Sequence, residues 1–166
     1  MKRQCPTGVP HDRRLKVLDT ASIISLIDPK VQPMSVKCIN PEGISTPETF
    51  THVITAKGSR MVFIAGQVAE DDGHLVGPGD MVAQSRQVFA NIGRCLKAAG
   101  ARADQVTKLT IFVAGYKREY LPQIEEGRFS LFGDHKPTDT LVGVAALSHP
   151  DFMLEVDAIA VVEENA

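Results

Sequence analysis

Two carboxylates in an otherwise apolar stretch near the end of the chain have the clearest potential for chemistry. Glu155 and Asp157 stand within 153–162, a run of small and β-branched residues that predicts a strand. Residues two apart on a strand share one face, so the two carboxylates point the same way. A charge on such a strand is costly to bury without a partner. We therefore expect Glu155 and Asp157 at a sheet edge, at a contact between subunits or in a ligand site.

The strand that carries these carboxylates is the last of eight expected elements, in the order β-β-β-α-β-α-β-β. The clearest helix begins after Asp80 as its N-cap, shows apolar residues at helical spacing, and stops at Gly100. A second helix is expected over 119–132, with core residues Leu121, Ile124, Leu131 and Phe132. Apolar runs bounded by turn-forming residues predict strands at 36–40, 51–56, 60–67, 108–113, 138–147 and 153–162.

This order predicts an α+β domain built on a mixed sheet with two helices on one face. Strand–helix–strand units favour parallel pairing, whereas adjacent strands at each end of the chain favour antiparallel pairing. The strands are apolar on both sides, but the two helices cover only one face. We therefore expect another subunit to bury the second face of the sheet.

Composition limits the classes of partner. The 166 residues carry a formal net charge of −2, which favours neither a nucleic acid nor a membrane surface as a partner. Three widely spaced cysteines without a CxxC pair indicate reduced thiols in a cytoplasmic protein. The histidines lack metal-ligand spacing, and no GxSxG motif or phosphate-binding loop is present, so we expect neither a metal nor a cofactor. Residues 1–33, rich in proline and basic residues, predict an N-terminal extension before a domain at 34–166.

Four segments in this order make the sequence resemble the RidA/YjgF family, also called the L-PSP endoribonuclease family. The similarity covers about Val36 to Val162. The segments that carry it are 62–68 (VFIAGQV), the helix at 84–101, 106–113 (VTKLTIFV), and the pair of strands at 137–147 and 154–160.

The resemblance implies a chorismate-mutase-like fold, a homotrimer, and ligand sites in the clefts between subunits. It also implies the chemistry of the family's enamine and imine deaminases. In these a strand glutamate positions the attacking water, an arginine two residues after a proline pairs with the substrate carboxylate, and a backbone N–H near a Gly-Gln pair holds the ligand. Glu155 matches the glutamate, and Gly66 and Gln67 match the Gly-Gln pair. Phe50 matches a tyrosine of the family if a two-residue insertion is allowed.

The sequence departs from the deaminases at the arginine. Two residues after Pro137 stands Asp139, between Thr138 and Thr140. A carboxylate here would repel a ligand carboxylate, so Asp139 either binds an amine-bearing ligand or lies at a solvated rim. The two threonines either donate hydroxyls to a ligand or simply favour a strand. Arg128 is a candidate replacement cation, although an arginine on a helix face is more often solvated.

Three functions remain open at this point. The first is a RidA-type hydrolase of enamines or imines with an altered substrate, in which Glu155 acts on water. The second is a trimer that binds a metabolite without turning it over, with Glu155 as a buried carboxylate between subunits. The third is the endoribonuclease of the family's older name, which the mildly acidic body of the chain disfavours. The first two functions call for a small-molecule ligand.

Overall fold

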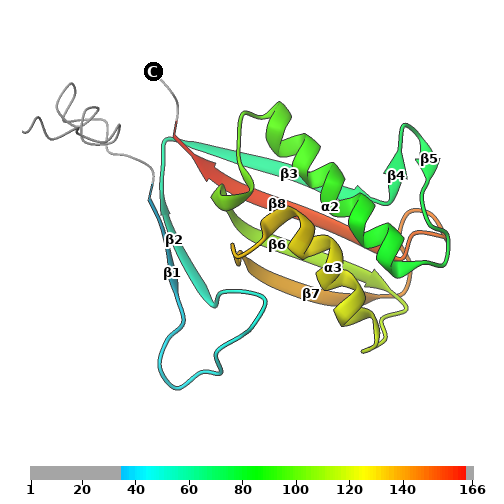
Figure 1. The fold of residues 1–166 in the computed structure, drawn as a ribbon, viewed down its shortest axis with the longest axis horizontal. Helices are drawn as coiled ribbons and strands as arrows, with labels where there is room; N and C mark the ends of the chain where they lie inside the picture. Colours follow the sequence, from blue (N-terminus) through cyan, green and yellow to red (C-terminus); the bar gives the residue numbers. More distant parts are fainter. Residues whose placement is uncertain (1–34, 164–166) are drawn as a thin grey trace, which may run out of the picture. The chain divides into compact units, whose positions relative to one another are not determined.

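The computed structural model describes residues 35–163, and the predicted extension at 1–33 lies outside the described residues. Figure 1 shows two helices over a sheet, with β1 and β2 as a separate ribbon. The helical elements are α2 (Met81–Ala98), the 3-10 turn η1 (Ala103–Gln105) and α3 (Tyr120–Phe132). The strands are β1 (Ser35–Ile39), β2 (Val53–Lys57), β3 (Arg60–Val68), β4 (Glu70–Asp71), β5 (His74–Leu75), β6 (Val106–Ala114), β7 (Thr138–Val144) and β8 (Leu154–Val162).

The main sheet has four strands in the order β3-β8-β6-β7. β6 and β7, which α3 connects, are parallel, whereas β8 is antiparallel to both of its neighbours. The α+β fold with a mixed sheet is therefore confirmed. The expected antiparallel pairing of the last two strands is wrong, because β8 inserts between β3 and β6 and leaves β7 at the edge. The nine residues of β8 alternate regularly between buried and half-buried, as suits a central strand, and the shorter β7 suits an edge.

Two smaller departures from the sequence-based prediction have local causes. The segment between β3 and α2, for which no strand was predicted, contains a tight hairpin in which β4 pairs with β5. The strand expected to reach residue 147 ends at Val144, because its partner β6 ends at Ala114. The backbone N–H of Gly115 donates to the carbonyl oxygen of Val144 at 3.0 Å and closes the pairing there.

Asp80 caps α2 as predicted. Its carboxylate accepts a hydrogen bond at 3.0 Å from the backbone N–H of Ala83, one of the donors that a first helical turn leaves unpaired. The helix ends before Gly100, whose φ of 64° is a conformation that other residues rarely adopt. The face of α2 turned to the core carries the buried residues Met81, Gln84, Ser85, Val88, Phe89, Ile92 and Leu96.

α3 approaches α2 so closely that Gly127 meets the backbone of Ser85. A Cβ at Gly127 would lie 2.5 Å from the carbonyl carbon and oxygen of Ser85, and the Ser85 hydroxyl donates to the carbonyl oxygen of Ile124 at 2.8 Å. This contact fixes the rotation of α3, so that Ile124, Arg128 and Phe132 form its buried stripe. The core position predicted for Leu121 is wrong, because this side chain lies outside the stripe and is exposed.

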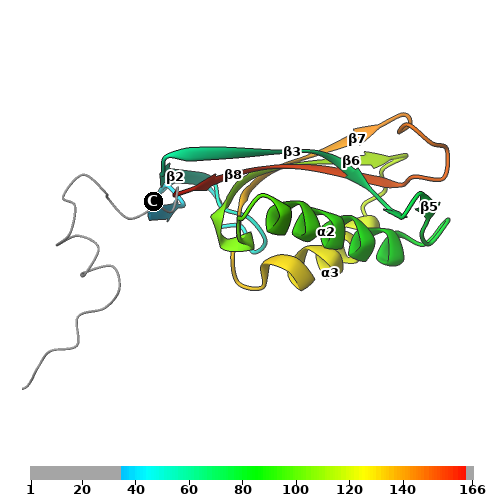
Figure 2. The ribbon, with the colours of Figure 1, turned by 90° about the horizontal axis from the view of Figure 1, so that it is seen from above.

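The two faces of the main sheet differ. α2 and α3 lie together on one face, as Figure 2 shows, and bury β6 residues Leu109, Ile111 and Val113 against the core. The other face, which carries Glu155, Asp157, Ile159 and Val161 of β8, is called the open face below. No helix within residues 35–163 is long and apolar enough to cross a bilayer.

Candidate functional site

Glu155 lies on the open face, in the middle of the main sheet. Its cross-strand neighbours are Val68 on β3 and Phe112 on β6, and Val142 of β7 continues the same row. The flanking β8 residues Leu154 and Val156 point the other way into the core. The strand pattern thus places one half-buried carboxylate among apolar side chains, as the sequence predicted for this strand.

Gly66 gives Glu155 the space that it occupies. The pairing of β3 with β8 shifts register between Ile64 and Gln67, so Gly66 sits in a β-bulge. A Cβ at Gly66 would lie 2.7 Å from Cδ and 2.9 Å from Cγ of Glu155, and closer still to one carboxylate oxygen. Gln67 closes the bulge by donating from its side-chain amide to the carbonyl oxygen of Ala65 at 3.0 Å. Two of the residues expected at the site, Gly66 and Glu155, are therefore in contact.

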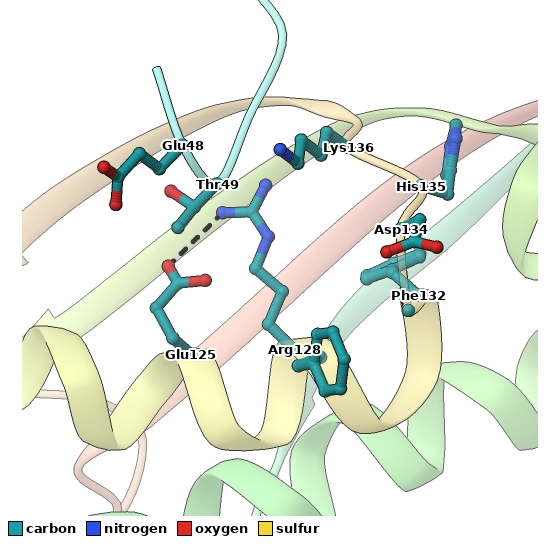
Figure 3. A pocket seen from close by; sticks show the side chains of 10 residues that line it. Glu48, Thr49, Glu125, Arg128, Phe132, Asp134, His135 and Lys136 are labelled. Atoms are coloured by element: carbon teal, nitrogen blue, oxygen red, sulfur yellow. Dashed lines mark ion pairs between the residues drawn. The ribbon is translucent and has the colours of Figure 1, made fainter.

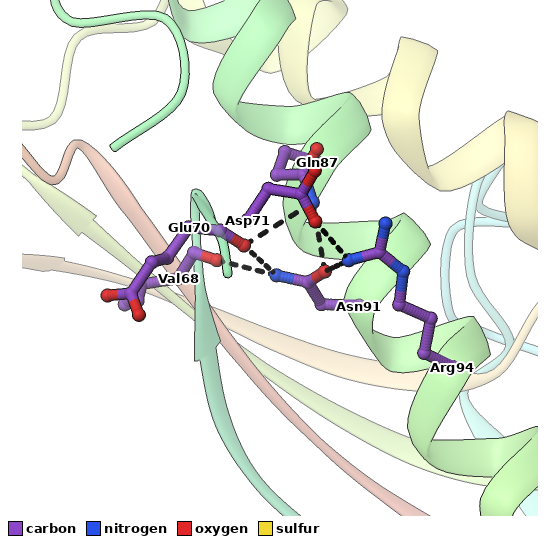
Figure 4. Close-up of polar contacts among 6 residues, drawn as sticks. All are labelled: Val68, Glu70, Asp71, Gln87, Asn91 and Arg94. Atoms are coloured by element: carbon purple, nitrogen blue, oxygen red, sulfur yellow. Dashed lines mark hydrogen bonds and ion pairs between the residues drawn. The ribbon is translucent and has the colours of Figure 1, made fainter. Parts of the chain in front are cut away.

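A polar network on α2 holds the strand end that follows this bulge. Asn91 donates to the carbonyl oxygens of Val68 at 3.1 Å and Glu70 at 2.8 Å. Arg94 pairs with Asp71 at 2.6 Å and also donates to the Asn91 side chain. Figure 4 shows these side chains converging from α2 on the end of β3 and on β4. The end of β3, and with it the bulge beside Glu155, is tied to a rigid helix.

The two threonines and Phe50 lie near the start of β7. Thr138 and Thr140 pair in register with Lys108 and Thr110 on β6. The Thr138 hydroxyl donates to the carbonyl oxygen of Thr107 at 2.6 Å, and the Thr140 hydroxyl accepts from Lys108. Both hydroxyls therefore have partners within the chain.

Phe50 stands in the loop before β2. The backbone N–H of its neighbour Thr51 donates to the carbonyl oxygen of Pro137 at 3.3 Å. The Phe50 ring meets the ring of His52 edge to face, with 5.3 Å between centroids. Phe50 is thereby held beside the beginning of β7.

Asp139 points to the opposite side of the sheet from Glu155. It pairs in register with the buried Leu109, so its side chain lies on the helix face. There its carboxylate forms a close ion pair with Arg128 of α3, and the same Arg128 nitrogen lies 3.5 Å from Glu125. Within one chain the structure therefore does not bring Asp139 and Glu155 together. The anion at position 139 already has a cation beside it.

Arg128 is buried, although the sequence-based interpretation favoured a solvated position for it. Its side chain is only 4% exposed, so the interpretation of Arg128 as a solvated helix residue is wrong. The sequence does indicate that Arg128 is buried, because it stands four residues after Ile124 and four before Phe132, on the apolar stripe of α3. A charge on such a stripe requires a buried partner, and Asp139 is that partner.

A cavity of about 240 Å³ opens beside this ion pair, between α3, the loop at 48–49 and the loop at 133–136. We call it the α3 pocket. In Figure 3 the guanidinium of Arg128 rises from α3 toward Thr49, with Glu125 on one side and Lys136 on the other. Burial raises the pKa of Glu125 above its ordinary value; the charge of Arg128 opposes this rise in pKa, and Asp139 adds to it.

The described residues offer no ready metal centre. Within 35–163, no group of three or more His, Cys, Asp or Glu side chains is arranged to hold a metal ion. Two sets of groups among the described residues are the candidates for ligand binding or chemistry. These are Glu155 and Gly66 on the open face, and the Arg128 cluster on the helix face.

Residues 43–162 match the protein family described as Endoribonuclease L-PSP. The chain belongs to this family. The resemblance to the RidA/YjgF proteins, stated from the four segments, is thereby confirmed.

Relatives within the family include deaminases. The chain is 30% identical over 128 residues to the 3-aminoacrylate deaminase RutC of Acinetobacter baylyi, which covers 76% of this chain and 98% of that protein. It is 35% identical over 104 residues to the mouse 2-iminobutanoate/2-iminopropanoate deaminase, and the match covers 61% of this chain and 74% of the mouse protein. Among solved structures, a Yersinia pestis protein of unknown function from the conserved Rid family has a TM-score of 0.71 at 34% identity. The match covers 76% of this chain and 98% of that chain.

Proposed function

We propose that this protein hydrolyses a small enamine or imine, with Glu155 as the group that positions and deprotonates water. One observation carries the proposal: the Glu155 carboxylate is seated against Gly66 in a β-bulge, on a sheet face whose apolar residues are uncovered. The deaminase relatives support the same reaction class.

The reaction that this geometry would serve is addition of water to a C=N bond. The water oxygen attacks the imine carbon and the π electrons move to nitrogen, while Glu155 takes the proton that the water releases and passes it to that nitrogen. In the carbinolamine that results, the C–N bond then breaks. The nitrogen leaves as ammonia, with Glu155 carrying the proton from the hydroxyl to the departing nitrogen. The products are a carbonyl compound and ammonia, and no cofactor is required.

We propose further that the open face is covered by other copies of the chain in a homotrimer, which would enclose Glu155. The solved relatives share this fold. Phe63 on β3 is 70% exposed and Met61 is 56% exposed, on the same side of the sheet as Ile159 and Val161. Apolar residues gathered on one face of a sheet are typical of an interface, and a specific one should bury at least about 1,000 Å².

Light scattering tests this assembly. The unmodified protein should show the mass of three chains at micromolar concentration. Phe63→Asp should shift the measured mass toward that of one chain, because the substitution would bury a carboxylate at the centre of the subunit interface. Phe129→Asp is the matched control, since Phe129 is 68% exposed but lies on α3, and it should stay trimeric. A monomeric unmodified protein would contradict the assembly.

The substrate is expected to differ from that of the deaminase relatives. Position 139, where the resemblance places an arginine, holds an aspartate that is already paired with Arg128. A charge-assisted hydrogen bond is worth roughly 1.5–3 kcal/mol, so its loss in the transition state slows turnover by at least about tenfold. We therefore expect kcat/KM for 2-iminopropanoate at least about tenfold below that of the mouse deaminase, and a higher value for imines without a carboxylate.

The assay is release of the carbonyl product from imines made in situ by amino-acid or amine oxidases, above spontaneous hydrolysis. Equal rates for the two proteins on 2-iminopropanoate would show that another cation serves the substrate carboxylate. Saturable binding of every imine without turnover of any would favour the alternative of a metabolite-binding protein over a hydrolase.

A further inference from the structure

Arg128, which lines the α3 pocket, carries a buried hydrogen-bond donor that has no acceptor among the described residues. Nη1 of Arg128 is engaged by Asp139 and Glu125, but Nη2 is fully buried and has no hydrogen-bond partner among the described residues. A buried donor left unpaired costs roughly 1–3 kcal/mol. An arginine that is 3% exposed overall and also lines a cavity therefore indicates that the cavity receives an acceptor atom.

The charges around the pocket restrict what can bring that acceptor. Two cations, Arg128 and Lys136, are outnumbered by carboxylates. These are Glu48, Glu125 and Asp134 in the lining, with Asp139 behind the guanidinium. A ligand that is only an anion would be repelled by the surplus of negative charge. A ligand that is only an amine would leave Nη2 of Arg128 without an acceptor. A molecule with a carboxylate next to an ammonium group answers both demands.

Size and lining agree with such a molecule. An apolar cavity of about 150 Å³ accommodates benzene, so 240 Å³ is sufficient for a ligand the size of an amino acid. The rings of Phe129 and Phe132 form one wall, and Phe129 is 68% exposed, which leaves apolar surface for a side chain to cover. The polar groups of the pocket lie on Arg128, Glu125 and the two loops, whereas the phenylalanine rings offer apolar surface. The charged end of a ligand and its apolar side chain would therefore contact different parts of the pocket.

We propose that the α3 pocket binds a small zwitterion of the α-amino-acid type. Its carboxylate accepts a hydrogen bond from Nη2 of Arg128, its ammonium group lies against Glu125, and an apolar side chain packs on Phe129. This site is separate from the proposed site at Glu155, because the pocket lies at α3 and Glu155 lies on the open face.

The ionisation of Glu125 gives the binding a pH dependence. Glu125 faces Arg128 on α3, Asp139 on β7, Glu48 and Thr49 on one loop, and Asp134, His135 and Lys136 on the other. Burial raises the pKa of Glu125, so its carboxylate keeps its proton to a higher pH than an exposed glutamate does. An ammonium group pairs only with the ionised form. Affinity should therefore increase as pH rises through the raised pKa of Glu125 and then level off.

The experiment is calorimetric titration of the purified protein with leucine, 4-methylpentanoate and 3-methylbutylamine, which share one side chain and carry both charged groups, the carboxylate alone or the amine alone. We expect leucine to bind at least about tenfold more tightly than either of the other two. Glu125→Gln should weaken leucine at least tenfold and remove the pH dependence. Arg128→Lys, which keeps a cation beside Asp139 but loses Nη2, should also weaken leucine at least tenfold.

Two controls separate the outcomes. Arg86→Lys changes an exposed arginine of α2 and should leave leucine binding unchanged. Glu155→Gln should also leave it unchanged, whatever that substitution does to imine turnover. Absence of saturable leucine binding would mean that a buried water alone satisfies Nη2, and would overturn the proposal. Equal binding of 4-methylpentanoate, or loss of leucine binding in Glu155→Gln, would overturn it as well.

Discussion

Arg128→Met should destabilise the domain by about 3–5 kcal/mol, the cost of leaving one partner of a buried ion pair alone. Methionine keeps most of the apolar stem of the side chain, so the change is chiefly electrostatic. It strands the Asp139 carboxylate, which is 12% exposed, and removes the cation beside Glu125. For a chain of this length we expect the melting temperature to fall by about 10 °C, measured by thermal or urea unfolding.

Two comparisons separate this loss from other effects of the substitution. Arg86→Met breaks the ion pair of Arg86 with Glu126, whose side chains are 64% and 49% exposed, and should cost less than about 1 kcal/mol. Arg128→Met combined with Asp139→Leu should recover most of the stability, because it removes both deeply buried charges and leaves only the more exposed Glu125 without its cation. A small loss in Arg128→Met, or no recovery in the double variant, would contradict a buried ion pair between Arg128 and Asp139.

The sequence predicted the elements of this fold better than their arrangement. Local signals such as the Asp80 cap and Gly100 are read from neighbouring residues, and the structure confirms both. The position of β8 between β3 and β6 depends on pairings between residues more than forty positions apart, such as Phe112 with Glu155. No local pattern encodes such a pairing, so the order of strands had to come from the structure.

The same distinction, between features read from neighbouring residues and features set by strand pairing, applies to the candidate site. The alternation along the last strand was sufficient to place Glu155 on one face with Asp157, and the structure shows that this face lies opposite the core. The contact of Glu155 with Gly66 comes from the bulge, which the structure reveals. The resemblance placed Asp139 and Glu155 at a cleft between subunits, which a single chain does not test. Within one chain, the register with Leu109 turns Asp139 toward α3 and Arg128, on the side of the sheet opposite Glu155. Which side of the sheet a residue faces changes with a register shift of one position, and only the paired strands fix it.

Gly66→Ala should lower imine turnover by roughly 100-fold while leaving the fold intact. The added methyl group would overlap the Glu155 carboxylate, and the end of a flexible side chain can move away. The carboxylate would then be displaced by about an ångström or more, and a misplacement of that size costs about 10²-fold in rate. The measurements are kcat on the best imine and the unfolding midpoint, which should change by less than the equivalent of about 1 kcal/mol.

Ala65→Ser, at the exposed residue before Gly66, is the control for a change in the bulge that does not reach Glu155. It should keep both activity and stability. Full activity in Gly66→Ala would show that the seat of the carboxylate against Gly66 is irrelevant to turnover. Loss of folding in Gly66→Ala would instead mean that the bulge cannot accept a methyl group.

The most direct test of the central claim is the ratio of kcat between the unmodified protein and Glu155→Gln on the best imine of the panel, at matched oligomeric state. Glutamine has the same shape but cannot take a proton from water, so we predict a loss of roughly 10²–10⁴-fold with an unchanged unfolding midpoint. A Glu155→Gln variant that is as active as the unmodified protein would contradict the assignment of Glu155 as the catalytic base.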